Sequence, residues 1–61
     1  MSSYRLYFVN DQGHIARAQA FEAASDEAAL AFAEEIAFGE RAELWDRGRM
    51  VAQLEAERRT A

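Results

Sequence analysis

The sequence has 61 residues, a formal net charge of −4, no cysteine and a single histidine, His14. The absence of cysteine excludes disulfide bonds and thiolate metal sites, and one histidine excludes a multi-histidine site. A chain this short buries only about 60% of the surface that its unfolded form exposes, so we expect self-association to supplement a thin core. The acidic balance disfavours non-specific binding of the whole surface to nucleic acid or to anionic membranes.

Composition and patterning indicate one globular domain. Hydrophobic residues make up 51% of the chain, and there is no proline and no linker. We expect a single domain over residues 1–61, ordered over residues 4–55, with a frayed, patternless tail over residues 55–61. No basic N-terminal segment precedes an apolar run, and no run approaches the roughly 20 residues that a bilayer requires. The expected location is therefore the cytoplasm.

Two strands and a tight turn are predicted at the start of the chain. Residues 4–9 are rich in aromatic and β-branched side chains, and residues 14–21 form the return strand. The turn spans residues 10–13, where Gly13 supplies the positive φ that a three-residue hairpin loop requires.

A helix is predicted over residues 28–38. The Ser25 hydroxyl can cap its first turn, and Asp26 and Glu27 place negative charge at the positive end of the helix dipole. Gly39 is the expected stop, and we expect Phe38 to pack where the last turn unwinds. At 100° per residue, one continuous apolar arc contains Ala29, Leu30, Phe32, Ala33, Ile36 and Ala37.

A second hairpin is predicted from strands at residues 41–45 and 49–54, joined by residues 46–48. Both hairpins contain Asp, any residue, Gly, a basic residue and two apolar residues, which we interpret as the same turn chemistry used twice. With three-residue loops, Val9 lies opposite Ile15 in the first hairpin, and Trp45 lies opposite Arg49 in the second.

These elements predict an α+β fold of order ββαββ, with a four-stranded antiparallel sheet and the helix packed on one face. A right-handed crossover favours the strand order second, first, third, fourth, and an order with the second and fourth strands central is the alternative. The helix-facing side is expected to carry Tyr4, Leu6, Phe8, Ala16, Ala18, Ala20, Ala42, Leu44, Met50, Ala52 and Leu54. The expected core is Leu6, Phe8, Leu30, Phe32, Ile36, Leu44 and Met50.

The other face of the sheet is left uncovered, because one helix cannot cover both sides. Four arginines are expected on it, Arg5, Arg17, Arg41 and Arg49, against Glu43 alone, for a formal charge of +3. Tyr7 opposite Arg17 and Trp45 opposite Arg49 would form cation–π pairs, which an ordinary solvated sheet face also contains. The interface candidates on this face are Arg5, Tyr7, Val9, Ile15, Arg17, Phe21, Trp45, Arg49 and Val51.

The sequence favours a non-catalytic self-associating or protein-interaction module, expected to be a homodimer joined through this face or through an edge strand. Two faces of charge +3 repel one another, whereas edge pairing avoids that repulsion. Weak single-stranded nucleic-acid binding on the arginine and aromatic side chains is the alternative. No set of nucleophile, base and orienting residue is visible, so neither an enzyme nor a cofactor or metal site is expected.

Five short runs resemble small uncharacterised alphaproteobacterial single-domain proteins of about this length. The runs are YRLYF at residues 4–8, DQGHI at 11–15, DEAA at 26–29, ELW at 43–45 and GRMVA at 48–52. The resemblance spans nearly the whole chain and implies a bacterial protein with a hairpin–helix–hairpin fold. It implies no activity, because the shared runs are turn and strand signals.

Overall fold

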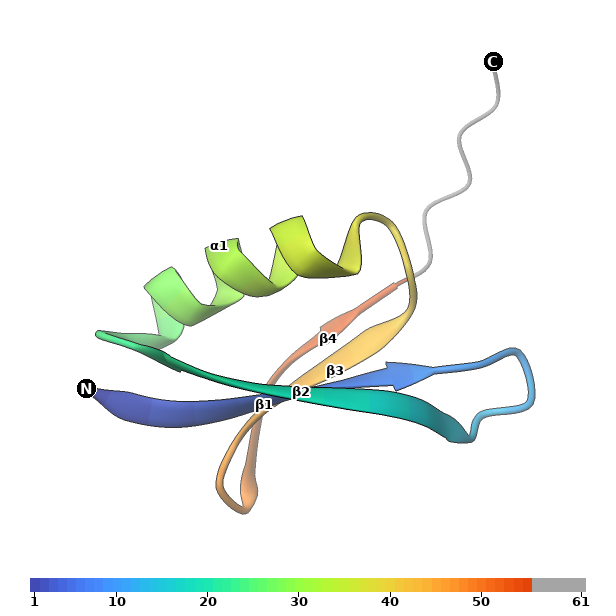
Figure 1. Ribbon diagram of the computed structural model, residues 1–61, viewed down its shortest axis with the longest axis horizontal. Helices are drawn as coiled ribbons and strands as arrows, with labels where there is room; N and C mark the ends of the chain where they lie inside the picture. Colours follow the sequence, from blue (N-terminus) through green and yellow to red (C-terminus); the bar gives the residue numbers. More distant parts are fainter. Residues whose placement is uncertain (56–61) are drawn as a thin grey trace.

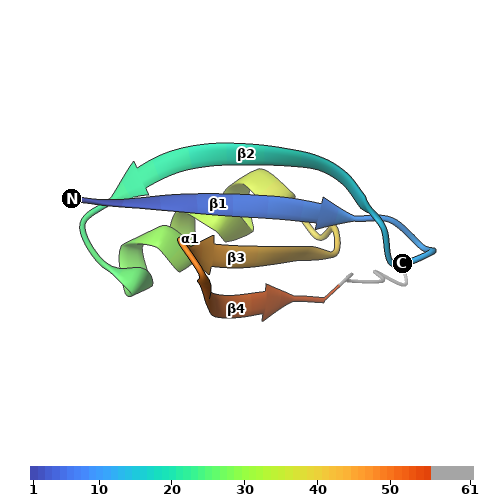
Figure 2. The same ribbon diagram turned by 90° about the horizontal axis from the view of Figure 1, so that it is seen from below.

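The computed structural model describes residues 1–55 and has the predicted α+β fold. Its elements are β1 (Ser2–Val9), β2 (Ile15–Ala23), α1 (Asp26–Ala37), β3 (Ala42–Asp46) and β4 (Arg49–Leu54). The four strands form one sheet in the order β2-β1-β3-β4, in which every neighbouring pair is antiparallel, and α1 lies on one side of it (Figure 1, Figure 2). The fold class and the favoured strand order are therefore confirmed. The predicted tail lies, beyond residue 55, outside the described residues.

Helix α1 has the predicted cap at Ser25 and the predicted stop at Gly39, but Phe38 does not behave as expected. The Ser25 hydroxyl accepts a hydrogen bond from the Ala28 amide at 3.1 Å, which caps the first turn. At the other end Phe38 adopts a left-handed conformation with φ of 50°, and Gly39 follows with φ of 83°. The expectation that Phe38 packs at this end is wrong, because the left-handed turn leaves its side chain 87% exposed.

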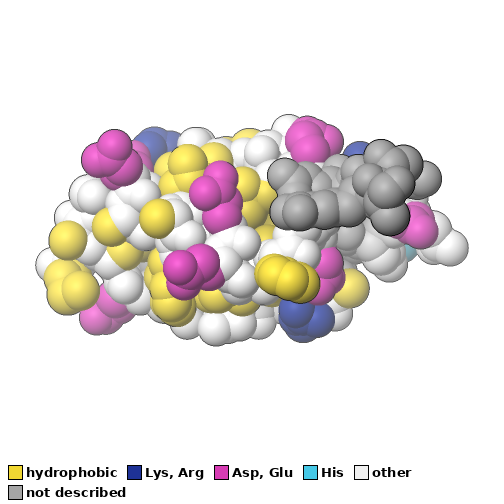
Figure 3. Space-filling view, turned by 90° about the horizontal axis from the view of Figure 1, so that it is seen from above, with side chains coloured by type: hydrophobic (Ala, Val, Ile, Leu, Met, Phe, Trp, Pro, Cys, Tyr) yellow, Lys and Arg dark blue, Asp and Glu magenta, His cyan; other side chains and the backbone are white. Residues whose placement is uncertain are grey.

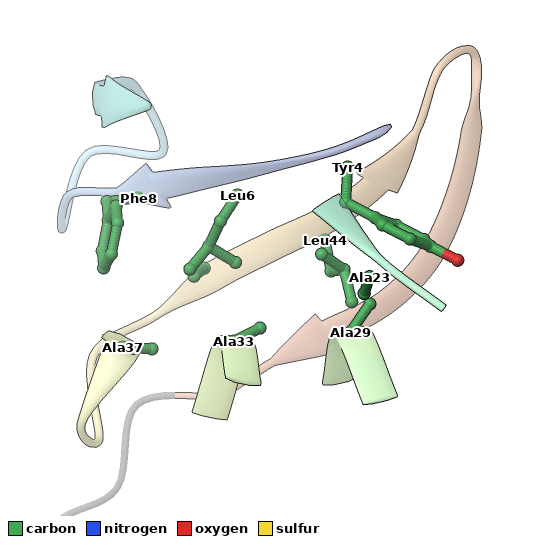
Figure 4. Packing of buried hydrophobic residues seen from close by; sticks show 9 residues of the cluster. Tyr4, Leu6, Phe8, Ala23, Ala29, Ala33, Ala37 and Leu44 are labelled. Atoms are coloured by element: carbon green, nitrogen blue, oxygen red, sulfur yellow. The ribbon is translucent and has the colours of Figure 1, made fainter. Parts of the chain in front are cut away.

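The core is made of large side chains from the sheet and alanines from the helix (Figure 4). Leu6 and Leu44 lie opposite one another on β1 and β3, and both are fully buried. The expected core residues Leu30 and Ile36 are only half-buried against this cluster. Phe32 and Met50 are 44% and 42% exposed, so their assignment to the core is wrong. The buried set is Tyr4, Leu6, Phe8, Ala23, Ala29, Ala33, Ala37, Ala42 and Leu44.

A β-bulge changes the register of the first hairpin. Val9 pairs with Ile15 as predicted, but the register shifts next to this pair, so that Phe8 pairs with Arg17 and Ala16 is passed over. Every following residue of β2 therefore points to the face opposite the one expected. Gln19 and Phe21 face the helix, paired with Leu6 and Tyr4, and the β2 alanines Ala18 and Ala20 face away from it.

Aromatic packing accounts for the shifted register. Because the fully buried residues of the helix are all alanines, Phe21 supplies volume that an alanine at the same place would not. Its ring stacks on Tyr4 at 5.9 Å between centroids and meets Phe32 at 4.8 Å. Four residues before Phe21 on β2, the Arg17 guanidinium lies 4.0 Å from the centroid of the Phe8 ring and covers it.

The second hairpin also departs from the expected register. Its turn contains two residues, since Asp46 pairs with Arg49, and the positive φ of 60° belongs to Arg47 rather than to Gly48. Trp45 consequently pairs with Met50, not with Arg49. A bulge at Val51 follows, so that Ala52 and Leu54 face the helix as predicted. Ala52 pairs with Leu44, and Leu54 pairs with Ala42. The interpretation of the two turns as chemically identical is wrong.

Candidate functional site: an open sheet edge

The structure divides the nine interface candidates between the two sides of the sheet. We call the side away from α1 the outer face. The outer face carries Arg5, Tyr7, Val9, Ile15 and Trp45, as predicted from the paired positions. Arg17, Phe21 and Arg49 lie on the helix side instead, because the bulge in the first hairpin and the two-residue turn in the second reverse their facing. Val51 sits in the second bulge and is half-buried against the core.

The charge of the outer face is correspondingly different from the expected +3. Arg5 and Arg41 remain on it, Arg47 of the β3–β4 turn adds a third positive charge, and the carboxylates of Glu22 and Glu43 reduce the formal total to +1. Tyr7 lies opposite Ala18 and Trp45 opposite Met50, so neither expected cation–π pair forms. The excess of positive charge that favoured nucleic-acid binding is therefore smaller on this face than expected.

Arg49 is exposed, but its guanidinium is paired with carboxylates of the same chain. Its guanidinium donates to both carboxylate oxygens of Asp26 at 3.2 Å and to Asp46 at 2.9 Å, and the Tyr4 hydroxyl donates to Asp26 at 2.8 Å. The hydrogen bonds from Arg49 and then from Tyr4 lower the pKa of Asp26 below its ordinary value. The same contact with Asp26 raises the pKa of Tyr4 and of Arg49. This network ties the second hairpin to the start of α1 and leaves Arg49 engaged within the chain.

The outer face forms an open groove near the start of β1. Figure 1 shows the β3–β4 turn extending below the sheet, away from α1. The residues that line the groove are Ser3, Tyr4, Arg5 and Tyr7 from β1, Ala20, Phe21 and Glu22 from β2, and Arg47 from that turn. Its lining mixes both signs of charge and contains no set of groups arranged for catalysis.

The backbone of β2 is the most distinctive surface feature. The Val9 amide donates to the Arg41 carbonyl at 3.0 Å, so the odd-numbered residues of β1 bond to β3 and the even-numbered ones bond to β2. In the β1–β2 register, the residues of β2 whose backbone N–H and C=O groups form hydrogen bonds with β1 are therefore Arg17, Gln19 and Phe21. The intervening residues, Ala18, Ala20 and Glu22, direct their N–H and C=O groups away from the sheet.

This edge has few of the features that normally protect a strand from pairing. Edge strands are usually short or carry lysine, proline or bulges. β2 is nine residues long and contains neither lysine nor proline, and its one bulge lies at its beginning. Two of its three outward-directed residues are alanines, whose side chains do not hinder an approaching strand. Residues 17–23 therefore form a regular and accessible edge.

The opposite edge of the sheet is protected. β4 has six residues, and the bulge at Val51 interrupts it near the middle. After the bulge, only Gln53 directs its backbone groups away from β3, since Ala52 and Leu54 pair with it. The two edges of one sheet thus differ in their capacity to accept another strand.

An exposed aromatic side chain of α1 lies beside β2. Phe32 contacts Phe21 of β2 and is 44% exposed. Beyond the end of α1, the Glu40 carboxylate reaches Arg17 of β2 at 3.9 Å. Figure 3 shows hydrophobic side chains exposed between scattered acidic ones over the helix side. The free edge is therefore flanked by apolar surface.

Edge pairing was one of the two predicted routes to association, but none of the nine interface candidates is an outward-directed residue of the β2 edge. The candidate list omitted Ala18 and Ala20, because the predicted register placed both under the helix. The alternating alanines of β2 were the available signal, since three alanines beside one phenylalanine indicate which set can be left exposed.

Other kinds of site find no support in the described part of the chain. Residues 1–55 contain no group of three metal-ligating side chains and no helix long and apolar enough to cross a bilayer. In the comparisons with known proteins, the chain matches no family model, no curated protein and no solved structure.

Proposed function

We propose that the protein is a non-catalytic interaction module that takes up an additional β-strand along β2. The observation that carries this proposal is the set of outward-directed backbone groups at Ala18, Ala20 and Glu22 on an unprotected edge. Strand addition at a free sheet edge is an established mode of polypeptide recognition, in which main-chain hydrogen bonds supply the affinity.

The expected binding is weak and depends on concentration. Each main-chain hydrogen bond contributes about 0.5–1.5 kcal/mol net, and association must also overcome the loss of translational and rotational freedom. The exposed Phe32 beside the edge adds apolar contact with an incoming strand. The outer face is a weaker candidate, because it mixes both signs of charge and its groove is open.

A synthetic peptide with the sequence of residues 15–23 tests the proposal, because it offers the edge a strand of matching length. Its binding to the protein is followed by fluorescence anisotropy of a dye at the peptide N-terminus. Ala20→Pro removes an outward N–H and places the ring where the new strand must lie, without removing a hydrogen bond to β1. We expect this variant to lose binding.

Gln53→Pro is the matched control, since Gln53 occupies the equivalent outward position on β4. It should bind the peptide as the parent does. Circular dichroism of both variants establishes that they are folded. The proposal is overturned if the parent neither binds the peptide nor associates at about 1 mM, where an interaction of about 4 kcal/mol would be half complete. Equal loss of binding in the two variants would also overturn it.

A further inference from the structure

We infer that the strand which β2 takes up is β2 of a second copy of this chain, antiparallel and related by a twofold axis at Ala20. This inference rests on the proposed function and names the partner. The resulting homodimer would have one continuous sheet of eight antiparallel strands, with two helices on the same side. Such an interface is isologous, so each copy contributes the same surface.

The spacing of the outward-directed residues determines this register. With Ala20 opposite Ala20 of the second copy, Ala18 lies opposite Glu22, and all three outward residues of each strand find a partner. A shift of two residues in one direction leaves Ala18 opposite Ala24, beyond the end of β2. The same shift in the other direction leaves Glu22 opposite the bulge at Ala16. Two copies of the β2 edge therefore pair completely only in the register centred on Ala20.

Side chains are compatible with this arrangement on both sides of the sheet. Around the axis the outer face carries Ala20 from each copy, which leaves room for close approach. On the helix side Gln19 lies opposite Phe21 of the second copy, and Arg17 lies opposite Ala23. No two like charges face one another, whereas a larger shift would set the two Glu22 side chains opposite each other.

Disulfide cross-linking tests the register, because the chain has no native cysteine. Opposite Cα atoms of a hydrogen-bonded antiparallel pair lie about 5.5 Å apart, within the range that a disulfide spans. We expect Ala20→Cys to form a covalent dimer under mild oxidation. Ala18→Cys is the matched control, since the two copies of residue 18 are separated by four residues, or about 13 Å, along the strands. The double variant Ala18→Cys, Glu22→Cys should cross-link again.

The expected result is that Ala20→Cys cross-links at least about tenfold faster than Ala18→Cys, and that urea abolishes the difference. Light scattering on the cysteine-free parent should show a concentration-dependent dimer. Equal cross-linking of the two single variants would overturn the inferred register. A parent that binds the residue 15–23 peptide but stays monomeric would overturn the inferred partner and leave the proposed function standing. A parent that does neither would overturn both.

Discussion

The first hairpin, β1–β2, and the second, β3–β4, each place a tight turn shortly before a β-bulge, at Ala16 and at Val51. After the bulge, β2 continues for seven residues, from Arg17 to Ala23, whereas β4 continues for three, from Ala52 to Leu54. A tight turn followed by a β-bulge therefore leaves a long regular edge at β2 and a short interrupted edge at β4. The position of a bulge along its strand decides whether that edge can accept a partner.

The two hairpins also hold the helix by different means. The first packs Phe21 of β2 against Phe32 of α1. The second reaches the start of α1 through the bonds between Arg49 and Asp26. Between the hairpins, the buried pair of Leu6 and Leu44 is shared. Loss of this shared contact should therefore matter more than the loss of either separate attachment.

Leu6→Ala should have the largest effect on stability. Leu6 is fully buried, and its truncation would leave a cavity beside Leu44, at a cost of about 2–5 kcal/mol in the free energy of unfolding. Leu54→Ala, at the half-buried end of β4, is the control and should cost less. Urea unfolding measures both. Equal costs would show that the two hairpins do not meet in a common core.

The sequence predicted the elements well because their signals are local. The Ser25 cap, the alternation of β1 and the sheet order follow from neighbouring residues and from the handedness of the crossover. The bulges at Ala16 and Val51 have no local signal, because neither involves glycine or proline. Packing of Phe21 against Phe32 of α1 selects the first one, and this contact appears only once the helix is in place. The facing of β2, and with it the side of the sheet on which Arg17 and Phe21 lie, was therefore predicted wrongly.

Phe32→Ala should have an intermediate effect on the first hairpin. A fully buried phenylalanine would cost about 3–5 kcal/mol, but this ring is 44% exposed and one of its contacts is the tilted ring of Phe21. We expect a loss of about 2 kcal/mol in the free energy of unfolding, measured by urea titration. A loss above about 4 kcal/mol would mean that the ring is buried in solution, for example by a second copy at the β2 edge.

The two turns should differ in how strongly they depend on glycine. Gly13 has φ of 83°, so Gly13→Ala should cost about 1 kcal/mol in the free energy of unfolding. Arg47 has φ of 60°, so Arg47→Gly should relieve strain and change the stability by less than about 0.5 kcal/mol, since the unfolded chain also gains freedom. Thermal unfolding of both variants tests this contrast. A large loss for Arg47→Gly would show that its side chain stabilises the second turn.

The smallest effect should come from the Asp26–Arg49 attachment of the second hairpin, and it should depend on pH. The Arg49 and Tyr4 hydrogen bonds lower the pKa of Asp26 in the folded state, so ionised Asp26 stabilises the fold above its unfolded pKa of about 3.9. As the pH falls through the lower, folded-state pKa, Asp26 becomes protonated and this contribution disappears. Asp26→Asn should therefore be less stable than the parent at pH 7, and the difference should shrink as the pH falls below about 4. Urea titrations of both proteins across pH 2–7 measure this difference directly. If the difference in the free energy of unfolding did not vary with pH, Asp26 would act through the geometry of its hydrogen bonds at the start of the helix rather than through its charge.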